Sequence, residues 1–171
     1  YCGVGTGRVI GREIIEEHTQ ACIDAGLLIE GTNAEVMPGQ WEFQIGAADA
    51  LTVSDHLYVA RWLLHRIAED YDVIISFAAK PVKGDWNGAG CHTNFSTVEM
   101  RSNYEACIAA AEALAPRHAL HIANYGYGIE ERLTGQHETA SYDKYFYGVS
   151  HRGASVRIPW QVAIDRKGYI E

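Results

Sequence analysis

The chain has 171 residues, which is enough for about one domain with a sizeable core. Its hydrophobic content of 47% and charged content of 21% are ordinary for a globular protein. The formal net charge of −8 argues against binding to a nucleic-acid backbone, which needs a basic surface. The sequence shows neither an apolar run long enough to span a bilayer nor a signal peptide. We therefore expect no nucleic-acid partner, no membrane association and a cytoplasmic location.

The cysteines and the chain ends support two further expectations. None of the four cysteines has C-x-x-C spacing, so we expect reduced thiols rather than a disulfide framework at Cys2, Cys22, Cys91 and Cys107. The chain starts at Tyr1 and stops directly after an apparent strand at residues 168–171. Domains usually end in polar, poorly ordered residues. We therefore interpret residues 1–171 as an internal fragment of a longer polypeptide.

The first half of the chain predicts a helix, a hairpin and a second helix. Residues 11–25 have apolar side chains at helical spacing, and Gly26 ends this helix. Residues 27–46 resemble a hairpin with Pro38-Gly39 near its middle. The second helix is predicted at residues 54–71, with Ser54 as its N-cap. Its predicted buried stripe consists of Leu57, Ala60, Leu64 and Ile67.

The second half predicts strands around one long helix. Residues 73–79 are apolar and β-branched at first, which predicts a buried strand, and residues 93–97 predict another. An Ala-rich helix is expected at residues 104–125, kinked or divided by Pro116. Loops and strands follow, at residues 133–138, 153–158 and 168–171. This order favours an α+β fold with a largely antiparallel sheet and flanking helices.

The segment at residues 80–96 is the most informative part of the sequence. The run from Asn87 to Gly90 has almost no side chains, so its backbone can approach a ligand closely. His92 follows and offers a metal ligand beside that backbone. A small polar molecule held on the main chain next to a cation is one interpretation. A glycine-rich turn between strands is an equally good one on spacing alone.

Two glutamates flank the turn of the predicted hairpin. Glu35 and Glu42 can face each other across the strands, where two carboxylates repel unless a cation neutralises them. Mg²⁺ and Mn²⁺ prefer such oxygen ligands. The alternative is a pair of glutamates on a solvated face, to which the spacing alone gives more weight.

Further charged residues follow towards the end of the chain. Arg132 and Glu138 surround a glycine turn, where Arg suits a carboxylate or phosphate and Glu can accept a proton. An ordinary surface loop is the alternative. Arg152 and Arg157 are five residues apart, so along a strand they point to opposite faces and need not share a ligand. Cations and Arg around a glycine-lined pocket suit phosphoryl transfer, or a metal-dependent hydrolase.

Together these blocks resemble glutamine synthetase of type II, over essentially the whole chain and in the family order. The resemblance is carried by residues 33–46, 80–96, 133–139 and 152–171. It implies part of the catalytic domain, with an incomplete active-site barrel. It also implies ATP-dependent ligation of ammonia to L-glutamate through γ-glutamyl phosphate. The implied cofactor is Mg²⁺ or Mn²⁺, ATP is a co-substrate, and the parent protein is a homo-oligomer, a decamer.

The resemblance also implies a role for each site residue. Glu138 would deprotonate ammonium as part of a flap, and Arg152 would lie near the transferring phosphoryl group. The remaining residues are expected to bind glutamate (Trp86, Asn87, Gly88, Arg132), ATP (Glu42, Phe43, Gln44, Asn94, Phe95, Ser96, Arg152, Arg157) and metal (Glu35, Glu42, His92, Glu171).

The sequence departs from the family in two respects. Trp160 stands where many relatives have Arg, and we expect local repacking there. The amino-terminal domain and the carboxy-terminal part are absent from the chain, so we expect the isolated fragment to bind metal weakly and catalyse little. Two alternatives remain: a relative that joins glutamate to an organic amine, and a non-catalytic scaffold. The full set of charged site residues argues against the scaffold.

Overall fold

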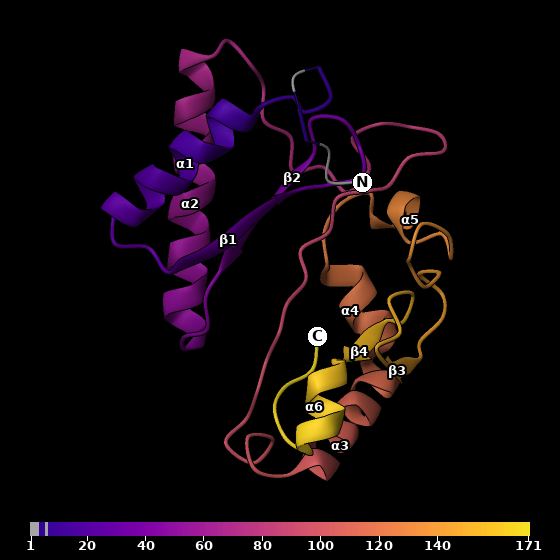
Figure 1. Ribbon diagram of the computed structural model, residues 1–171. Helices are drawn as coiled ribbons and strands as arrows, with labels where there is room; N and C mark the ends of the chain where they lie inside the picture. Colours follow the sequence, from indigo (N-terminus) through magenta and orange to yellow (C-terminus); the bar gives the residue numbers. More distant parts are fainter. Residues whose placement is uncertain (1–3, 6) are drawn as a thin grey trace. The chain divides into compact units, whose positions relative to one another are not determined.

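The computed structural model describes residues 4, 5 and 7–171, so Cys2 lies outside the described residues (Figure 1). The chain forms two compact units, Tyr1–Ser76 and Phe77–Glu171. None of the helices in the described part is both long and apolar enough to cross a membrane. The regular elements are α1 (Arg12–Asp24), β1 (Ile29–Ala34), β2 (Trp41–Ile45), α2 (Ala50–Asp70), α3 (Tyr104–Leu114), η1 (Ala115–Arg117), α4 (His118–Asn124), α5 (Ile129–Arg132), β3 (Tyr147–Val149), β4 (Val156–Ile158) and α6 (Trp160–Asp165).

In the first unit, α1 packs against α2 and the hairpin of β1 and β2 lies beside them (Figure 1). The predicted first helix is confirmed, and it is bounded by Gly11 and Gly26, whose φ angles of 83° and 75° are left-handed. The buried side chains of α1 are Ile15, His18 and Cys22. They face a core made with the buried α2 residues Ala60, Leu64, Ile67 and Ala68.

The predicted start of α2 at Ser54 is wrong. The helix begins four residues earlier, and its N-cap is Asp49, whose carboxylate accepts the backbone N–H groups of Leu51 and Thr52 at 3.1 Å. Ser54 lies inside the helix, and its hydroxyl donates to the Ala50 carbonyl. A Ser that bonds back to the preceding turn is compatible with a helix interior, so its capping preference did not decide the boundary.

The core of the second unit joins α3 to the end of the chain. Its buried residues are Met100, Tyr104, Cys107, Ala111, Val156, Ile158, Val162 and Ile170. The predicted division of the long helix at Pro116 is confirmed, because a 3₁₀ turn at Ala115–Arg117 separates α3 from α4. Pro lacks the N–H that a continuous helix would use at this position.

The α+β class is confirmed, and the described residues form one antiparallel and one parallel pair of strands. β1 pairs with β2 in antiparallel register, whereas β3 pairs with β4 in parallel register. The predicted strand at residues 73–79 is wrong: Ile74 is 97% exposed and the segment joins no ladder in the described chain. Residues 93–97 contribute only one bridge, between Phe95 and Ile170. The sequence did not predict α5, β3 or α6.

Candidate functional site

The two glutamates of the hairpin lie on one face of it. Asn33 is paired with Glu42, and the Glu35 N–H donates to the Gln40 carbonyl at 2.9 Å. Because alternate residues share a face, Glu42 lies diagonally across from Glu35. Glu35 accepts a hydrogen bond from Asn33 Nδ2 at 2.7 Å, and Glu42 accepts one from Gln44 Nε2 at 2.8 Å. Each carboxylate keeps further lone pairs, so the pair fits a divalent cation.

The opposite face of β2 is anchored by a buried histidine. Phe43 makes an edge-to-face contact with His18, with their ring centroids 5.0 Å apart. His18 Nε2–H donates to the Ala60 carbonyl at 2.8 Å, and its buried Nδ1 has no partner among the described atoms. Burial lowers the pKa of His18, although the bond to Ala60 acts in the other direction. A neutral imidazole therefore links α1, α2 and the strand that carries Glu42.

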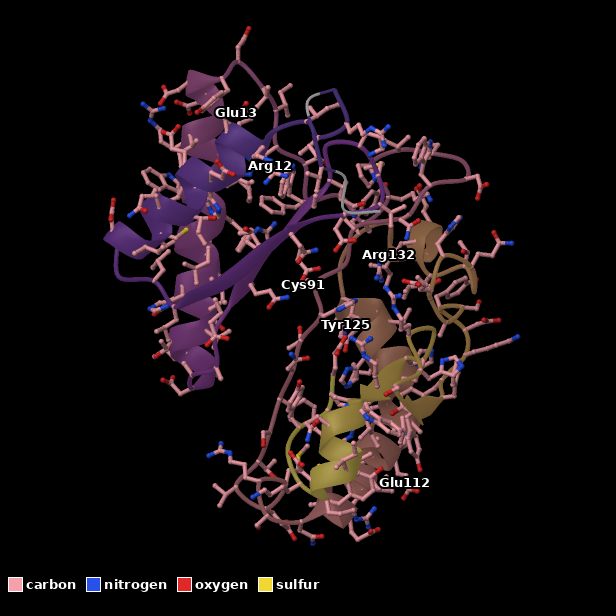
Figure 2. All side chains as sticks on the ribbon, viewed as in Figure 1. Arg12, Glu13, Cys91, Glu112, Tyr125 and Arg132 are labelled. Atoms are coloured by element: carbon pink, nitrogen blue, oxygen red, sulfur yellow. The ribbon has the colours of Figure 1, made fainter. Side chains whose placement is uncertain are left out.

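Arg132 lies across the backbone of the glycine-rich segment, and Figure 2 labels it at the end of α5. A Cβ added at Gly90 would stand 2.5 Å from Arg132 Nη2. One added at Gly88 would stand 2.5 Å from the Ala79 carbonyl oxygen and 2.6 Å from Arg132 Cγ. At Gly88 a side chain would collide with backbone, so this position requires glycine, whereas a side chain at Gly90 would displace the Arg132 guanidinium. Within the part of the chain that the structure describes, no carboxylate pairs with Arg132, and burial lowers its pKa.

Hydrogen bonds within residues 79–89 hold the loop that leads into the glycine-rich segment. Trp86 N–H donates to the Gly84 carbonyl at 2.9 Å, and Lys80 Nζ donates to the Trp86 carbonyl. Ala89 N–H donates to the Ala79 carbonyl at 2.9 Å. These bonds place Asn87 and Gly88 in a fixed, half-buried stretch beside Arg132.

His92, Arg157 and Glu171 form a second cluster. His92 Nδ1 lies 3.0 Å from Glu171 Oε1, and Arg157 donates to both carboxylate oxygens, with Nε at 3.0 Å from Oε2. Burial alone would raise the pKa of Glu171, but the hydrogen bonds from His92 and Arg157 lower it to about 2. Backbone bonds in both directions also join Arg157 to Glu171, at 2.8 and 2.9 Å.

The predicted nucleotide-contacting stretch runs alongside this cluster. Phe95 exchanges two backbone hydrogen bonds with Ile170, and Ser96 Oγ donates to the Gly168 carbonyl at 2.6 Å. Asn94 is exposed. The residues next to His92 and Glu171 are therefore brought together from segments more than 70 residues apart.

Each predicted metal pair lies within one unit and supplies two donors. No group of three His, Cys, Asp or Glu side chains in the described chain could hold a metal ion. Glu35 and Glu42 nevertheless supply the carboxylate oxygens that Mg²⁺ or Mn²⁺ prefers, and His92 with Glu171 supplies one carboxylate and one imidazole. Each pair fits as part of a coordination shell.

Glu138 and Arg152 form a third cluster, joined by an ion pair of 2.9 Å. Arg152 and Arg157 thus contact different carboxylates, and Arg152 lies before β4 rather than along it. Both His137 and Glu138 have left-handed backbones, with φ angles of 51° and 61°. Such a conformation costs a non-glycine residue about 1–3 kcal/mol and clusters at functional sites. The loop borders a pocket of about 670 Å³, which is lined by both residues.

Two features were not anticipated or differ from expectation. No sequence signal connects His137 with Asp85, yet His137 Nε2 lies 3.1 Å from Asp85 Oδ1. The one sequence signal for His137 itself is that it stands directly before the candidate residue Glu138.

Trp160, where repacking was expected, is the first residue of α6 and is 65% exposed. Its indole lies largely in solvent rather than in a rearranged core.

The fold is of the α+β class, and its clusters of carboxylates and arginines are candidates for binding cations and anions. Comparison with known proteins identifies the family. A family model described as "Glutamine synthetase, catalytic domain" matches residues 9–123. A glutamine synthetase of Streptomyces hygroscopicus is 62% identical over 173 residues, covering 100% of this chain and 51% of that protein. The corresponding enzyme of Frankia alni is 61% identical over 171 residues, covering 100% of the chain and 49% of the relative. A glutamine synthetase of Schizosaccharomyces pombe is 56% identical over 173 residues, covering 100% of this chain and 48% of that protein.

The chain belongs to the glutamine synthetase family, which confirms the resemblance. It spans about half the length of the curated relatives that it matches. The alignments cover the whole chain, so the clusters beyond residue 123 lie within the similarity.

Proposed function

We propose that the polypeptide containing these residues ligates ammonia to L-glutamate, converting ATP to ADP and phosphate. The γ-carboxylate would first be phosphorylated, and ammonia would then displace phosphate from γ-glutamyl phosphate. Similarity over the whole chain to proteins named glutamine synthetase supports this proposal. We also propose that the chain is part of the catalytic domain of a longer polypeptide, a cytoplasmic homo-oligomer and a decamer. That extension rests on family resemblance.

The observation that carries the proposal is the environment of Arg132. Arg132 is half-buried, and partial removal of its charge from water is unfavourable unless an anion pairs with it. The described residues supply no carboxylate to it. Gly88 and Gly90 leave the adjacent backbone bare. A planar carboxylate suits the fork of a guanidinium, so glutamate is a fitting occupant.

Glu138 and Arg152 would act together in the proposed reaction. Ammonium cannot attack, so a carboxylate must bind it and accept a proton. Glu138 is positioned for that role only when it leaves Arg152, with which it now forms an ion pair. Arg152 would then offset the charge on the transferring phosphoryl group. Breaking the ion pair between Glu138 and Arg152 would therefore prepare Glu138 for ammonium and Arg152 for the phosphoryl group.

The remaining clusters would hold the co-substrate and its cations. Mg²⁺ or Mn²⁺, when bound, would neutralise phosphate and carboxylate charge. Glu35 and Glu42 would hold one ion, and His92 and Glu171 the other. Arg157, together with residues 42–44 and 94–96, would contact ATP. Trp86, Asn87 and Gly88 would hold glutamate beside Arg132.

The decisive experiment is a γ-glutamyl hydroxamate assay on the full polypeptide, with Mn²⁺ and nucleotide, followed by glutamine formation from ammonia and a panel of alkylamines. We expect hydroxamate, and glutamine with ammonia as the preferred amine. Absence of hydroxamate would overturn the proposal, and preference for an alkylamine would indicate a glutamate–amine ligase. Arg132→Met should weaken glutamate binding, whereas the exposed Arg117→Met serves as the matched control.

A further inference from the structure

The turn that carries Glu138 has an unfavourable sequence for its shape. Thr139 N–H donates to the Gln136 carbonyl at 3.1 Å, so His137 and Glu138 are the two central residues. Both have positive φ, as in a type I′ turn, where Gly and Asn are favoured. A His-Glu pair in this position needs contacts outside the turn to hold it.

Each of the two central residues has such a contact. Glu138 is paired with Arg152 at 2.9 Å, and His137 Nε2 lies 3.1 Å from Asp85 Oδ1. The His137 side chain is only 27% exposed, whereas Asp85 extends from its own loop with 96% exposure. The His137 side chain is therefore packed against the turn, and the Asp85 side chain that contacts it is solvent-exposed.

The contact joins two parts of the proposed active site. Asp85 lies in the loop closed by Trp86 N–H and the Gly84 carbonyl, two residues before Asn87. His137 directly precedes Glu138. A second ion pair, Lys83–Glu131, joins the same loop to α5 without touching the turn.

We propose that His137, through Asp85, is a positioning residue that sets the Glu138 turn relative to the glutamate-binding segment. The inference rests on the proposed function. The Asp85–His137 contact holds the turn in its left-handed form from one side, so that Glu138 can exchange Arg152 for ammonium without the turn relaxing.

The test compares variants of the full polypeptide: Asp85→Ala, Asp85→Asn, His137→Asn and the Asp85→Ala/His137→Asn double variant. Asn tolerates the left-handed backbone but is too short to reach Asp85. We expect each of Asp85→Ala and His137→Asn to raise the KM for ammonium about tenfold, with smaller changes for glutamate and ATP. The double variant should be no worse than either single one. Asp85→Asn keeps an oxygen that accepts the His137 Nε2–H, so its KM for ammonium should stay within about twofold of that of the unaltered protein.

Lys83→Gln is the matched control, because it breaks the neighbouring ion pair, and it should change the KM for ammonium less than about twofold. If the unaltered protein forms no glutamine, the proposed function fails. If it is active and Asp85→Ala leaves the ammonium KM unchanged, or if the two single effects add, the positioning role is wrong. Asp85 is exposed, so Asp85→Ala decides the matter even where His137→Asn does not fold.

Discussion

The two units carry very different charges. Residues 1–76 contain 4 of the 14 Lys and Arg and 12 of the 22 Asp and Glu, so the entire net charge of −8 falls there. Residues 77–171 contain the other 10 of each and are neutral overall. The acidic unit holds the candidate carboxylate pair for a cation, and the neutral unit holds the arginines that suit anions. The average acidity of the chain therefore says little about either site.

The units also differ in how they hold their candidate residues. Glu35 and Glu42 are placed by the register of a regular hairpin. Arg132, Glu138 and Glu171 are placed by contacts between side chains and distant loops. The second kind of placement depends on a few close approaches and ion pairs, so single substitutions should disturb it more.

The largest effect is expected at Gly88. Gly88→Ala puts a Cβ against the Ala79 carbonyl and Arg132 Cγ, so either the segment or the guanidinium must move. We expect a loss of about a thousandfold in kcat/KM for glutamate. Gly31→Ala in β1 is the control, since no atom lies within 4 Å of its added Cβ. Steady-state kinetics on both variants measures the difference, and equal losses would contradict the contrast between the units.

The next effect concerns the stability contributed by Glu171. Its pKa is lowered from 4.5 to about 2, so the folded state releases this proton more readily than the unfolded state does. The resulting stabilisation is complete above pH 4.5 and is lost as the pH falls towards 2. It amounts to about 3 kcal/mol.

Urea unfolding across this pH range checks the prediction. Glu171→Gln should remove that part of the pH dependence, whereas Glu130→Gln, at an exposed residue of α5, should keep it. If the free energy of unfolding falls with pH in the same way for Glu171→Gln and for the unaltered protein, then Glu171 does not contribute this pH-dependent stability.

The smallest effect is expected at His18 in the acidic unit. Burial lowers the pKa of His18, so the unfolded state binds this proton more readily. Stability from the neutral imidazole is present above pH 6.5 and is lost as the pH falls below it. His18→Leu should cost about 1–2 kcal/mol at neutral pH, because the Ala60 carbonyl loses its donor.

The variant should also flatten the fall in stability on mild acidification, which chemical denaturation at several pH values would show. His121→Leu in α4 is the control. An unchanged acid response in His18→Leu would mean that the buried imidazole does not titrate with unfolding.

The sequence predicted those elements whose signals are local. Gly11 and Gly26 bound α1, and Pro116 divides the long helix, because each acts through its own backbone. The strand predicted at residues 73–79 failed for the opposite reason. Apolar, β-branched residues favour a strand only when another strand pairs with them, and Ile74 is instead exposed.

The sequence suggested candidate site residues but not the contacts between them. Composition and spacing suggested Glu35, Glu42, His92 and the arginines, and family resemblance supplied the roles that remain proposals. No spacing rule connects Arg132 with Gly90, or Asp85 with His137, because those contacts depend on how loops fold over tens of residues. The parallel pairing of β3 with β4 is likewise a tertiary result.

The burial of two cysteines has a practical consequence for chemical labelling. Cys22 and Cys107 are buried free thiols. Desolvation raises the pKa of Cys22 to about 11, and burial also raises the pKa of Cys107 above its ordinary value. Because only a thiolate reacts readily, alkylating reagents should spare both. Cys91 is exposed, labelled in Figure 2, and stands between Gly90 and His92. A fluorophore attached at Cys91 would therefore report on ligands arriving at the glycine-rich segment while the two interior thiols stay unmodified.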